Sequence, residues 1–197
     1  MKRIRNIILF AGVAIVMNAC KLDNYIEPDA SIHGSVIDAA TGEPVQQDIV
    51  DGSKIIYVEQ GFQNPEEQNM AVKTDGSYEN ARVFAGKYNI YFNESNFLRP
   101  DTLKSHAINR GENKLDFEVQ PYIRVTGANI TKVDNKIVAT FTIDPSVANK
   151  VKEIGLFAHI DYVVGNRFKL VEAKQQVDAP LNTPAVYTLE IDLTSGN

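Results

Sequence analysis

The chain has 197 residues, of which 44% are hydrophobic and 23% are charged, a composition typical of one or two globular domains. Its 25 acidic residues outnumber its 20 basic ones, which gives a formal net charge of −5 at pH 7. An acidic chain lacks the positive surface that binds a phosphate backbone, so the composition argues against nucleic acid as a partner.

The N-terminus has the three-part pattern of an export signal. A basic segment, 2–5, precedes the apolar run 7–17, and Ala19 then precedes Cys20, the single cysteine of the chain. The apolar run is shorter than the ~20 residues that cross a bilayer, so it predicts a signal peptide rather than a membrane-spanning helix. Residues 17–20 resemble a lipobox, in which the cysteine thiol receives the lipid. A secreted protein with a free thiol, or a short uncleaved anchor, is the alternative.

We therefore assign residues 1–19 to a lipoprotein signal peptide and residues 20–30 to the acylated Cys20 and a polar tether. Removal of 1–19 takes away three basic residues and no acid, which leaves 17 basic against 25 acidic residues and a net charge of −8. Several acyl chains anchor a protein durably, so a membrane is the first predicted partner. A chain with one cysteine forms no internal disulfide, so the fold must depend on its apolar core.

From Ser31 onward the apolar residues recur with a period of two, as in half-buried strands. Turns are predicted at Thr41-Gly42-Glu43-Pro44 and around Asp75-Gly76, because glycine accepts positive φ and proline fixes φ. Segments 60–68 and 93–101 are polar and are predicted to be loops. The predicted strands of this half are 31–36, 54–59, 70–73, a strand that leaves the turn at Asp75-Gly76 and leads to 82–84, 88–92 and 113–120.

The second half repeats this pattern, and only 145–152 has the composition of a helical turn. Strands at regular spacing, without helical periodicity, predict an all-β fold of two β-sandwiches in tandem, 31–120 and 121–197. We expect the second sandwich to be incomplete at its C-terminal edge, which more chain or a partner strand would complete. The predicted strands of this half are 122–126, 136–143, 154–159, 168–176 and 186–193.

Four motifs of the first half resemble the carboxypeptidase regulatory-like domain, a small transthyretin-like sandwich. They are GSVID (34–38), TGEPV (41–45), TDGSY (74–78) and AGKY (85–88). Together with DNY (23–25) and DFEVQPYIRV (116–125), they make the chain resemble a Bacteroidetes surface lipoprotein family of unknown function. Members of that family pair the first domain with an immunoglobulin- or fibronectin-like second domain.

The resemblance implies an outer-membrane location, and Asp23 and Glu27 close to the anchor favour the cell exterior over the periplasmic face. It also implies accessory work in glycan binding or uptake, of the kind encoded by polysaccharide utilisation loci. The implied partners are a polysaccharide and a complex of an outer-membrane transporter with a glycan-capturing lipoprotein. A structural spacer, an adhesin or an assembly module completed by a partner strand is the alternative.

No motif in the sequence predicts catalysis or metal binding. His33, His106 and His159 are far apart and lack the spacing of zinc ligands. Asp75-Gly76 resembles part of a calcium loop, but the later oxygen ligands are missing and a turn is the better interpretation. There is no Gly-x-Ser-x-Gly motif, and a hydrolase would have only unspecific carboxylates to work with. We predict no metal, no cofactor and no enzymatic activity.

Three polar loops combine aromatic rings with amide or charged side chains, which is the composition of a sugar site. The candidate ligand-binding residues in these loops are Phe62, Asn64, Arg99, Tyr162 and Arg167. Each aromatic ring has an alternative role as a plug at the end of a sandwich. The plug is the favoured interpretation for Phe97, whereas the two roles are balanced for Phe62 and Tyr162.

Two further expectations concern a modification and the core. Thr102 lies in Asp101-Thr102-Leu103, which resembles an O-glycosylation acceptor of this bacterial group, with a chance match as the alternative. Four aromatic residues on alternating strand positions are expected in the core: Tyr88, Phe92, Phe117 and Phe141.

Overall fold

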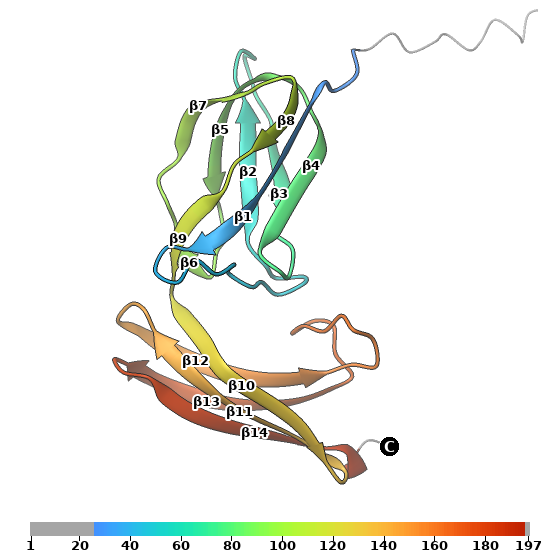
Figure 1. Ribbon diagram of the computed structural model, residues 1–197, viewed down its shortest axis with the longest axis vertical. Coiled ribbons are helices and arrows are strands. Elements are labelled where there is room, and N and C mark those ends of the chain that lie inside the picture. The colour runs from blue at the N-terminus through green and yellow to red at the C-terminus, as the bar shows by residue number, and fades with distance from the viewer. Residues whose placement is uncertain (1–25, 196–197) are drawn as a thin grey trace, which may run out of the picture.

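The computed structural model of the protein describes residues 26–195 (Figure 1). The predicted signal peptide and the predicted lipid-attachment residue, Cys20, lie outside this range. Within it, no helix is both long enough and apolar enough to span a membrane. The described chain is built almost wholly from strands, which confirms the all-β prediction, and its one helical element is a 3₁₀ turn at Leu193–Ser195.

Nine strands form the two sheets of the N-terminal sandwich (Figure 1). One sheet has the order β4-β1-β9-β6, with β8 also paired to β1, and the other has the order β3-β2-β5-β7. Along β1, buried and half-buried residues alternate strictly, as the period of two predicted. The strands are β1 (Ala30–Asp38), β2 (Lys54–Glu59), β3 (Glu67–Ala71), β4 (Ser77–Val83), β5 (Gly86–Phe92), β6 (Phe97–Leu98), β7 (Leu103–Ile108), β8 (Gly111–Lys114) and β9 (Phe117–Pro121).

The strand predicted at 113–120 is divided into β8 and β9, because β1 approaches the chain between them very closely at Gly34. A Cβ on Gly34 would lie 1.9 Å from the carbonyl oxygen of Leu115, so only glycine fits there. The hydroxyl of Tyr78 donates a hydrogen bond to the same carbonyl. The backbone N–H of Ser35 donates to the Asp116 carboxylate at 2.9 Å. These contacts replace the regular strand-to-strand hydrogen bonds at the break between β8 and β9.

Two strands of this sandwich were not predicted. β6 interrupts the loop expected at 93–101, and its two residues pair only with the end of β9. β7 pairs only with β5 at the edge of its sheet, and most of its residues are half-buried or exposed. An edge strand that buries little apolar surface carries no strong alternation, so its sequence gave no signal.

Five strands form the C-terminal sandwich, one near each predicted position. They make a three-stranded sheet, β10-β11-β14, and a two-stranded sheet, β12-β13. The helical turn predicted at 145–152 is wrong, because this segment ends β11 and begins β12. Val151 in it pairs with Ala179 and is buried in the core, so tertiary packing decides its conformation. The strands are β10 (Ile123–Val133), β11 (Lys136–Pro145), β12 (Asn149–Ala158), β13 (Val171–Leu181) and β14 (Ala185–Asp192).

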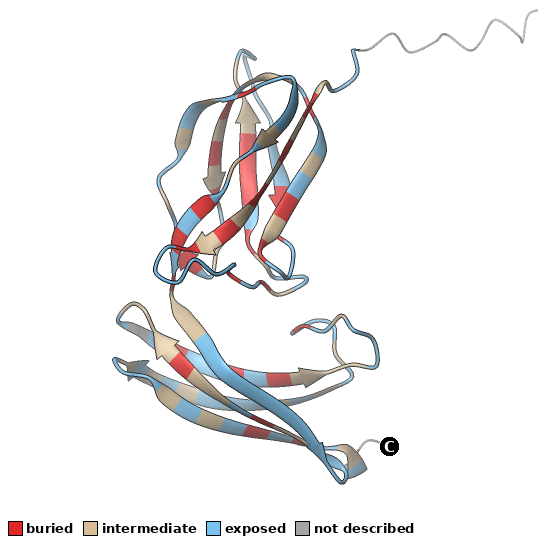
Figure 2. Ribbon diagram, in the orientation of Figure 1, coloured by how far each residue is buried: buried red, intermediate tan, exposed pale blue. Residues whose placement is uncertain are grey.

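Each sandwich has its own hydrophobic core, and the two cores share no residue (Figure 2). The first contains 17 buried residues and the second contains seven, so the N-terminal sandwich is the better-packed one. Tyr88, Phe92 and Phe117 are buried in the first core, as predicted. Phe141 is half-buried against the second core and stacks on Tyr187.

Candidate functional site

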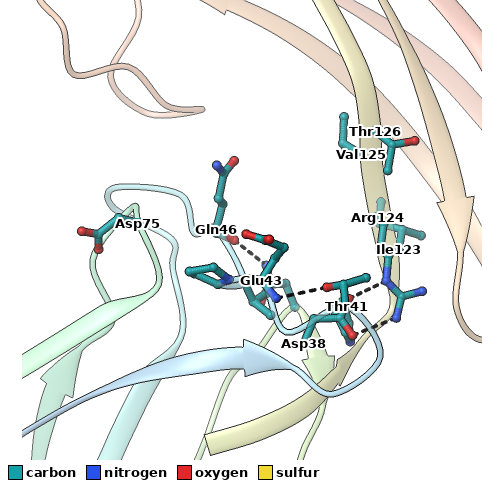
Figure 3. A pocket seen from close by; sticks show the side chains of 13 residues that line it. Asp38, Thr41, Glu43, Gln46, Asp75, Ile123, Arg124, Val125 and Thr126 are labelled. Atoms are coloured by element: carbon teal, nitrogen blue, oxygen red, sulfur yellow. Dashed lines mark hydrogen bonds and ion pairs between the residues drawn. The ribbon is translucent and has the colours of Figure 1, made fainter. Parts of the chain in front are cut away.

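A cavity of about 740 Å³ lies where the two sandwiches meet, and we call it the junction cavity (Figure 3). One wall is the chain that follows β1, residues 38–46, together with Asp75 and Asn96. The opposite wall is Pro121 and the first residues of β10, 123–126. The cavity is therefore lined from both sandwiches, and their relative position determines its shape.

A partly buried ion pair joins the two walls. Nε and Nη2 of Arg124, on β10, donate to the two carboxylate oxygens of Asp38, at the end of β1, with distances of 2.5 and 2.9 Å (Figure 3). These hydrogen bonds, assisted by one from the N–H of Ala40, lower the pKa of Asp38 to about 2 against the opposing effect of burial. The same pairing raises the pKa of Arg124. Such a bidentate pair fixes direction as well as distance.

The turn predicted after β1 brings the cavity wall back toward the sheet. The backbone N–H of Gly42 donates to the carbonyl of Asp38 at 2.8 Å, and Gly42 has a φ of +76°. Gly76, in the β3–β4 turn, has a φ of +82°, and a Cβ there would lie 2.9 Å from the carbonyl oxygen of Val45. Both predicted turns are thus confirmed, and both depend on glycine.

A network of amide and hydroxyl groups holds this wall from behind, and in it Gln47 and Ser53 are buried whereas Asn96 is exposed. The Gln47 side chain donates to Asn96 Oδ1 at 3.0 Å and accepts from the Ser53 hydroxyl at 2.8 Å. The Asn96 amide in turn donates to the carbonyl of Gln46 at 3.0 Å. Every polar or charged residue that is buried in residues 26–195, namely Asp38, Gln47 and Ser53, lies at this end of the first sandwich. No buried side-chain polar atom of the described chain lacks a hydrogen-bond partner.

A second connection between the sandwiches involves residues 159–170, which join β12 to β13 and which we call the junction loop. The backbone N–H of Asn166 donates to Asp48 at 2.9 Å, and the Arg167 guanidinium lies 2.9 Å from the Asp51 carboxylate. Burial raises the pKa of Asp48, but hydrogen bonds from backbone N–H groups, that of Asn166 included, outweigh it and lower the pKa overall. The sandwiches are therefore connected at two separate places.

Large apolar side chains are exposed on these connected loops. The ring of Tyr162 is 99% exposed, and the half-buried ring of His159 stacks on Phe168 with a centroid distance of 4.4 Å. Apolar surface of this kind often marks a binding surface. The exposed large hydrophobic residues of the two loops are Ile49, Val50, Ile160, Tyr162, Val164, Phe168 and Leu170.

The structure does not bring the five candidate ligand-binding residues together. Phe62, which is 63% exposed, and Asn64 lie in the loop of residues 60–66 between β2 and β3, which we call the far loop because it lies at the end away from the second sandwich (Figure 1). Tyr162 and Arg167 lie in the junction loop. None of these four lines the junction cavity.

The second polar loop lies near the junction. Arg99 follows β6, and its Nη1 donates to the carbonyl of Asn93 at 3.0 Å. Phe97 in the same loop is fully buried and packs edge-on against Phe92, so the plug is the correct interpretation. Thr102 is exposed between β6 and β7, as an acceptor of glycosylation must be.

The cavity offers hydrogen-bonding groups and short apolar surfaces to a ligand. Its lining includes the carboxylates of Glu43 and Asp75 and the amides of Gln46 and Asn96. In residues 26–195, no group of three or more His, Cys, Asp or Glu side chains could hold a metal ion. Such a lining suits reversible binding of a polar, uncharged or weakly charged molecule.

Sequence reasoning missed the pair at the centre of this site. Asp38 and Arg124 both lie in motifs that were noticed, but they are 86 positions apart and nothing in the sequence links them. A signal did exist, because Arg124 is a charged residue within the apolar stretch Tyr-Ile-Arg-Val directly after the predicted domain boundary. A charge in such a place usually has a partner.

Comparison with known proteins gives relatives for most of the described chain. Residues 30–120 match a family model described as the N-terminal domain of a protein of unknown function, DUF3823. A comparison with curated proteins gave no match.

Three solved structures share the fold. The chain is 38% identical to a candidate carbohydrate-binding protein from Bacteroides uniformis, with a TM-score of 0.76 over 85% of this chain and 80% of that one. It is 27% identical to a DUF3823 family protein from Bacteroides ovatus, with a TM-score of 0.68 over 85% and 83% of the two chains. A DUF3823 family protein from Parabacteroides merdae has the same fold at 15% identity, with a TM-score of 0.69 over 87% of each chain.

Proposed function

The chain belongs to the DUF3823 family, whose function is unknown, and from this premise we propose that it is a non-enzymatic carbohydrate-binding protein whose glycan occupies the junction cavity. The observation that carries the proposal is a cavity of about 740 Å³ whose polar lining is held in place by buried contacts. The family relative from Bacteroides uniformis, itself a candidate carbohydrate-binding protein, supports the same class of ligand.

The dimensions and chemistry of the cavity suit a short glycan segment. Its volume lies within the ~300–1,000 Å³ that small-molecule sites occupy. Thr41, Gln46, Asn96 and Thr126 offer hydroxyl and amide groups to sugar hydroxyls, and Val125 offers an apolar patch to the C–H face of a ring. Because the Asp38–Arg124 pair and the Gln47 network already hold the walls, binding requires little ordering of the protein.

We propose further that the protein is a lipoprotein of the outer membrane, attached through Cys20 and facing the cell exterior. It would work there with an outer-membrane transporter and its glycan-capturing lipoprotein. The N-terminal pattern of a basic segment, an apolar run and Ala19-Cys20 supports this location. Intact mass of the membrane-extracted protein tests it: a diacylglyceryl adduct on a chain that begins at residue 20 is expected, and a free thiol would contradict it.

The binding proposal is tested by calorimetric titration with a panel of oligosaccharides. Substitutions in the cavity lining, Gln46→Ala and Thr126→Ala, should weaken binding about thirtyfold together, because each removes hydrogen bonds worth about 1 kcal/mol. Substitutions in the far loop, Phe62→Ser and Asn64→Ala, are the matched control and should leave affinity unchanged. Loss of binding in the control alone would move the site to the far loop, and no binding across the panel would reject the proposal.

A second candidate function, an assembly module completed by a partner strand, is favoured by the exposed side of β10. Val125 and Ile130 are cross-strand neighbours of the buried Ile143 and Ala139, yet they are 58% and 61% exposed. β10 pairs only with β11 within the described residues, so its other edge can accept a strand. Light scattering and co-purification test this function. The assembly function would be rejected by a protein that is strictly monomeric and co-purifies with no partner. In that case the backbone amides of β10 would exchange freely with solvent and would stay unprotected after the protein is mixed with membrane extract.

A further inference from the structure

The ionisable groups that line the junction cavity are unequal in sign. Three are acidic (Asp38, Glu43 and Asp75) and one is basic (Arg124). The charge of the Arg124 guanidinium is balanced by the Asp38 carboxylate, to which Nε and Nη2 donate hydrogen bonds. The cavity therefore carries a net charge of about −2, and its one cation is charge-paired.

The two remaining carboxylates among the lining residues are those of Glu43 and Asp75, and neither is paired with a cation in the cavity. Glu43 has no ion-pair partner within the described chain, and its side chain is exposed. Asp75 accepts hydrogen bonds from the backbone N–H and the hydroxyl of Ser77, at 2.9 and 2.7 Å. Those hydrogen bonds lower the pKa of Asp75, which keeps it charged at neutral pH.

We infer that the junction cavity selects uncharged glycans and rejects uronic acids and sulfated sugars, an inference that depends on the proposed function. Recognition of a carboxylate or sulfate requires Arg, Lys or converging N–H donors, and the single cation of this cavity is already paired. A neutral sugar needs no cation and instead donates a hydroxyl hydrogen to the exposed Glu43 carboxylate in a charge-assisted hydrogen bond. The carboxylates of Glu43 and Asp75 both repel an acidic ring.

The charge of the whole protein acts in the same direction. Residues 26–195 contain 16 basic and 24 acidic residues, a net charge of −8. An anionic polymer therefore meets a repulsive field before it reaches the cavity, and this contribution weakens as salt rises.

Matched pairs of oligosaccharides that differ only in the carboxylate test the inference. Trisaccharides of glucose, galactose and mannose are titrated calorimetrically against the corresponding uronates, at low and at physiological salt. We expect the affinity for each neutral trisaccharide that binds to be about tenfold higher than the affinity for its uronate. This ratio of affinities should be smaller at the higher salt concentration. The double variant Glu43→Gln, Asp75→Asn should reduce that ratio to about threefold or less. The control Glu66→Gln, Glu112→Gln changes net charge equally outside the cavity and should preserve it.

The possible outcomes separate the inference from the function on which it depends. A uronate that binds as tightly as its neutral counterpart overturns the charge selection and leaves carbohydrate binding standing. An equal loss of discrimination in the control variant also overturns it, because the selectivity would then come from net charge alone. Absence of binding to every neutral and acidic sugar rejects the proposed function, and the inference with it.

Discussion

The two ends of the N-terminal sandwich are built from similar strands but differ in what they bury. At the end that faces the second sandwich, Asp38, Gln47 and Ser53 are buried with all their polar atoms paired. At the opposite end, the far loop exposes Phe62 and makes no contact with the second sandwich. Burying polar groups costs free energy that an apolar core would not. Because these buried polar residues gather at the end that faces the second sandwich, we infer that their hydrogen bonds hold the wall of the junction cavity in a fixed position.

The difference also separates two ways of presenting a ligand-binding surface. The far loop presents an exposed aromatic ring, whereas the junction presents hydrogen-bonding groups on walls held by Arg124 and Gln47. A preorganised site loses less entropy on binding. Four experiments test this contrast, in order of decreasing effect.

Removal of one partner of the partly buried ion pair should have the largest effect. Asp38→Ala leaves the half-buried Arg124 guanidinium without the two hydrogen bonds and the charge of its partner, so we expect the free energy of unfolding to fall by about 2.5 kcal/mol. Denaturant titration measures the change. The double variant Asp38→Ala, Arg124→Met should recover part of the loss, because it removes the unpaired charge. A single variant as stable as the wild type would show that the pair does not hold the junction.

Acid should weaken the junction through the same carboxylate. The pKa of Asp38 is lowered to about 2 in the folded protein, below its ordinary value, so its contribution is complete above about pH 4 and is lost as the pH falls toward 2. We expect about 2 kcal/mol of stability to disappear over that range. Asp38→Asn cannot titrate and should lack this share of the pH dependence. An identical acid profile in wild type and variant would contradict the assigned pKa.

Loss of the amide network should have a smaller effect. Gln47→Ala leaves the buried N–H and hydroxyl of Ser53 without their acceptor, and we expect a destabilisation of about 1.5 kcal/mol. Thermal denaturation measures it, with Asn64→Ala in the far loop as the matched control, for which a change within about 0.5 kcal/mol is expected. Equal effects at the two ends would remove the contrast between them.

The exposed connection between the loops should contribute least. The Arg167 side chain is 69% exposed in its pair with Asp51, and exposed pairs contribute less than about 1 kcal/mol. Arg167→Ala should therefore change stability by less than about 0.5 kcal/mol, with an effect that salt abolishes. Small-angle scattering should nevertheless detect a looser angle between the sandwiches if this contact helps to fix it. An unchanged scattering curve would assign the angle to the Asp38–Arg124 pair and the Asn166–Asp48 hydrogen bond.

Local patterns predicted much of the fold. β2 was predicted with its observed bounds, because its run of β-branched and aromatic residues is buried and bounded by polar loops. β7 was missed because an edge strand of half-exposed residues has little alternation. The helical turn at 145–152 was wrong because Val151 packs into a core that the local sequence does not reveal.

The candidate site was less predictable than the fold. The turns at Gly42 and Gly76, which shape one wall, followed from residue type. The pair Asp38–Arg124 depends on the relative position of the sandwiches, which no local pattern encodes. The network of Gln47 and Asn96 likewise joins residues 49 positions apart. Aromatic composition instead drew attention to loops that do not converge on one site.

Backbone amide chemical shifts, recorded by NMR during titration with the tightest-binding neutral oligosaccharide, test the junction cavity most directly as the glycan site. We expect the saturating shifts to fall in residues 38–46, 75–77 and 123–126, on both walls at the same midpoint. The far loop, 60–66, should not respond. Saturating shifts confined to the far loop or to the junction loop, with both cavity walls unchanged, would contradict the account.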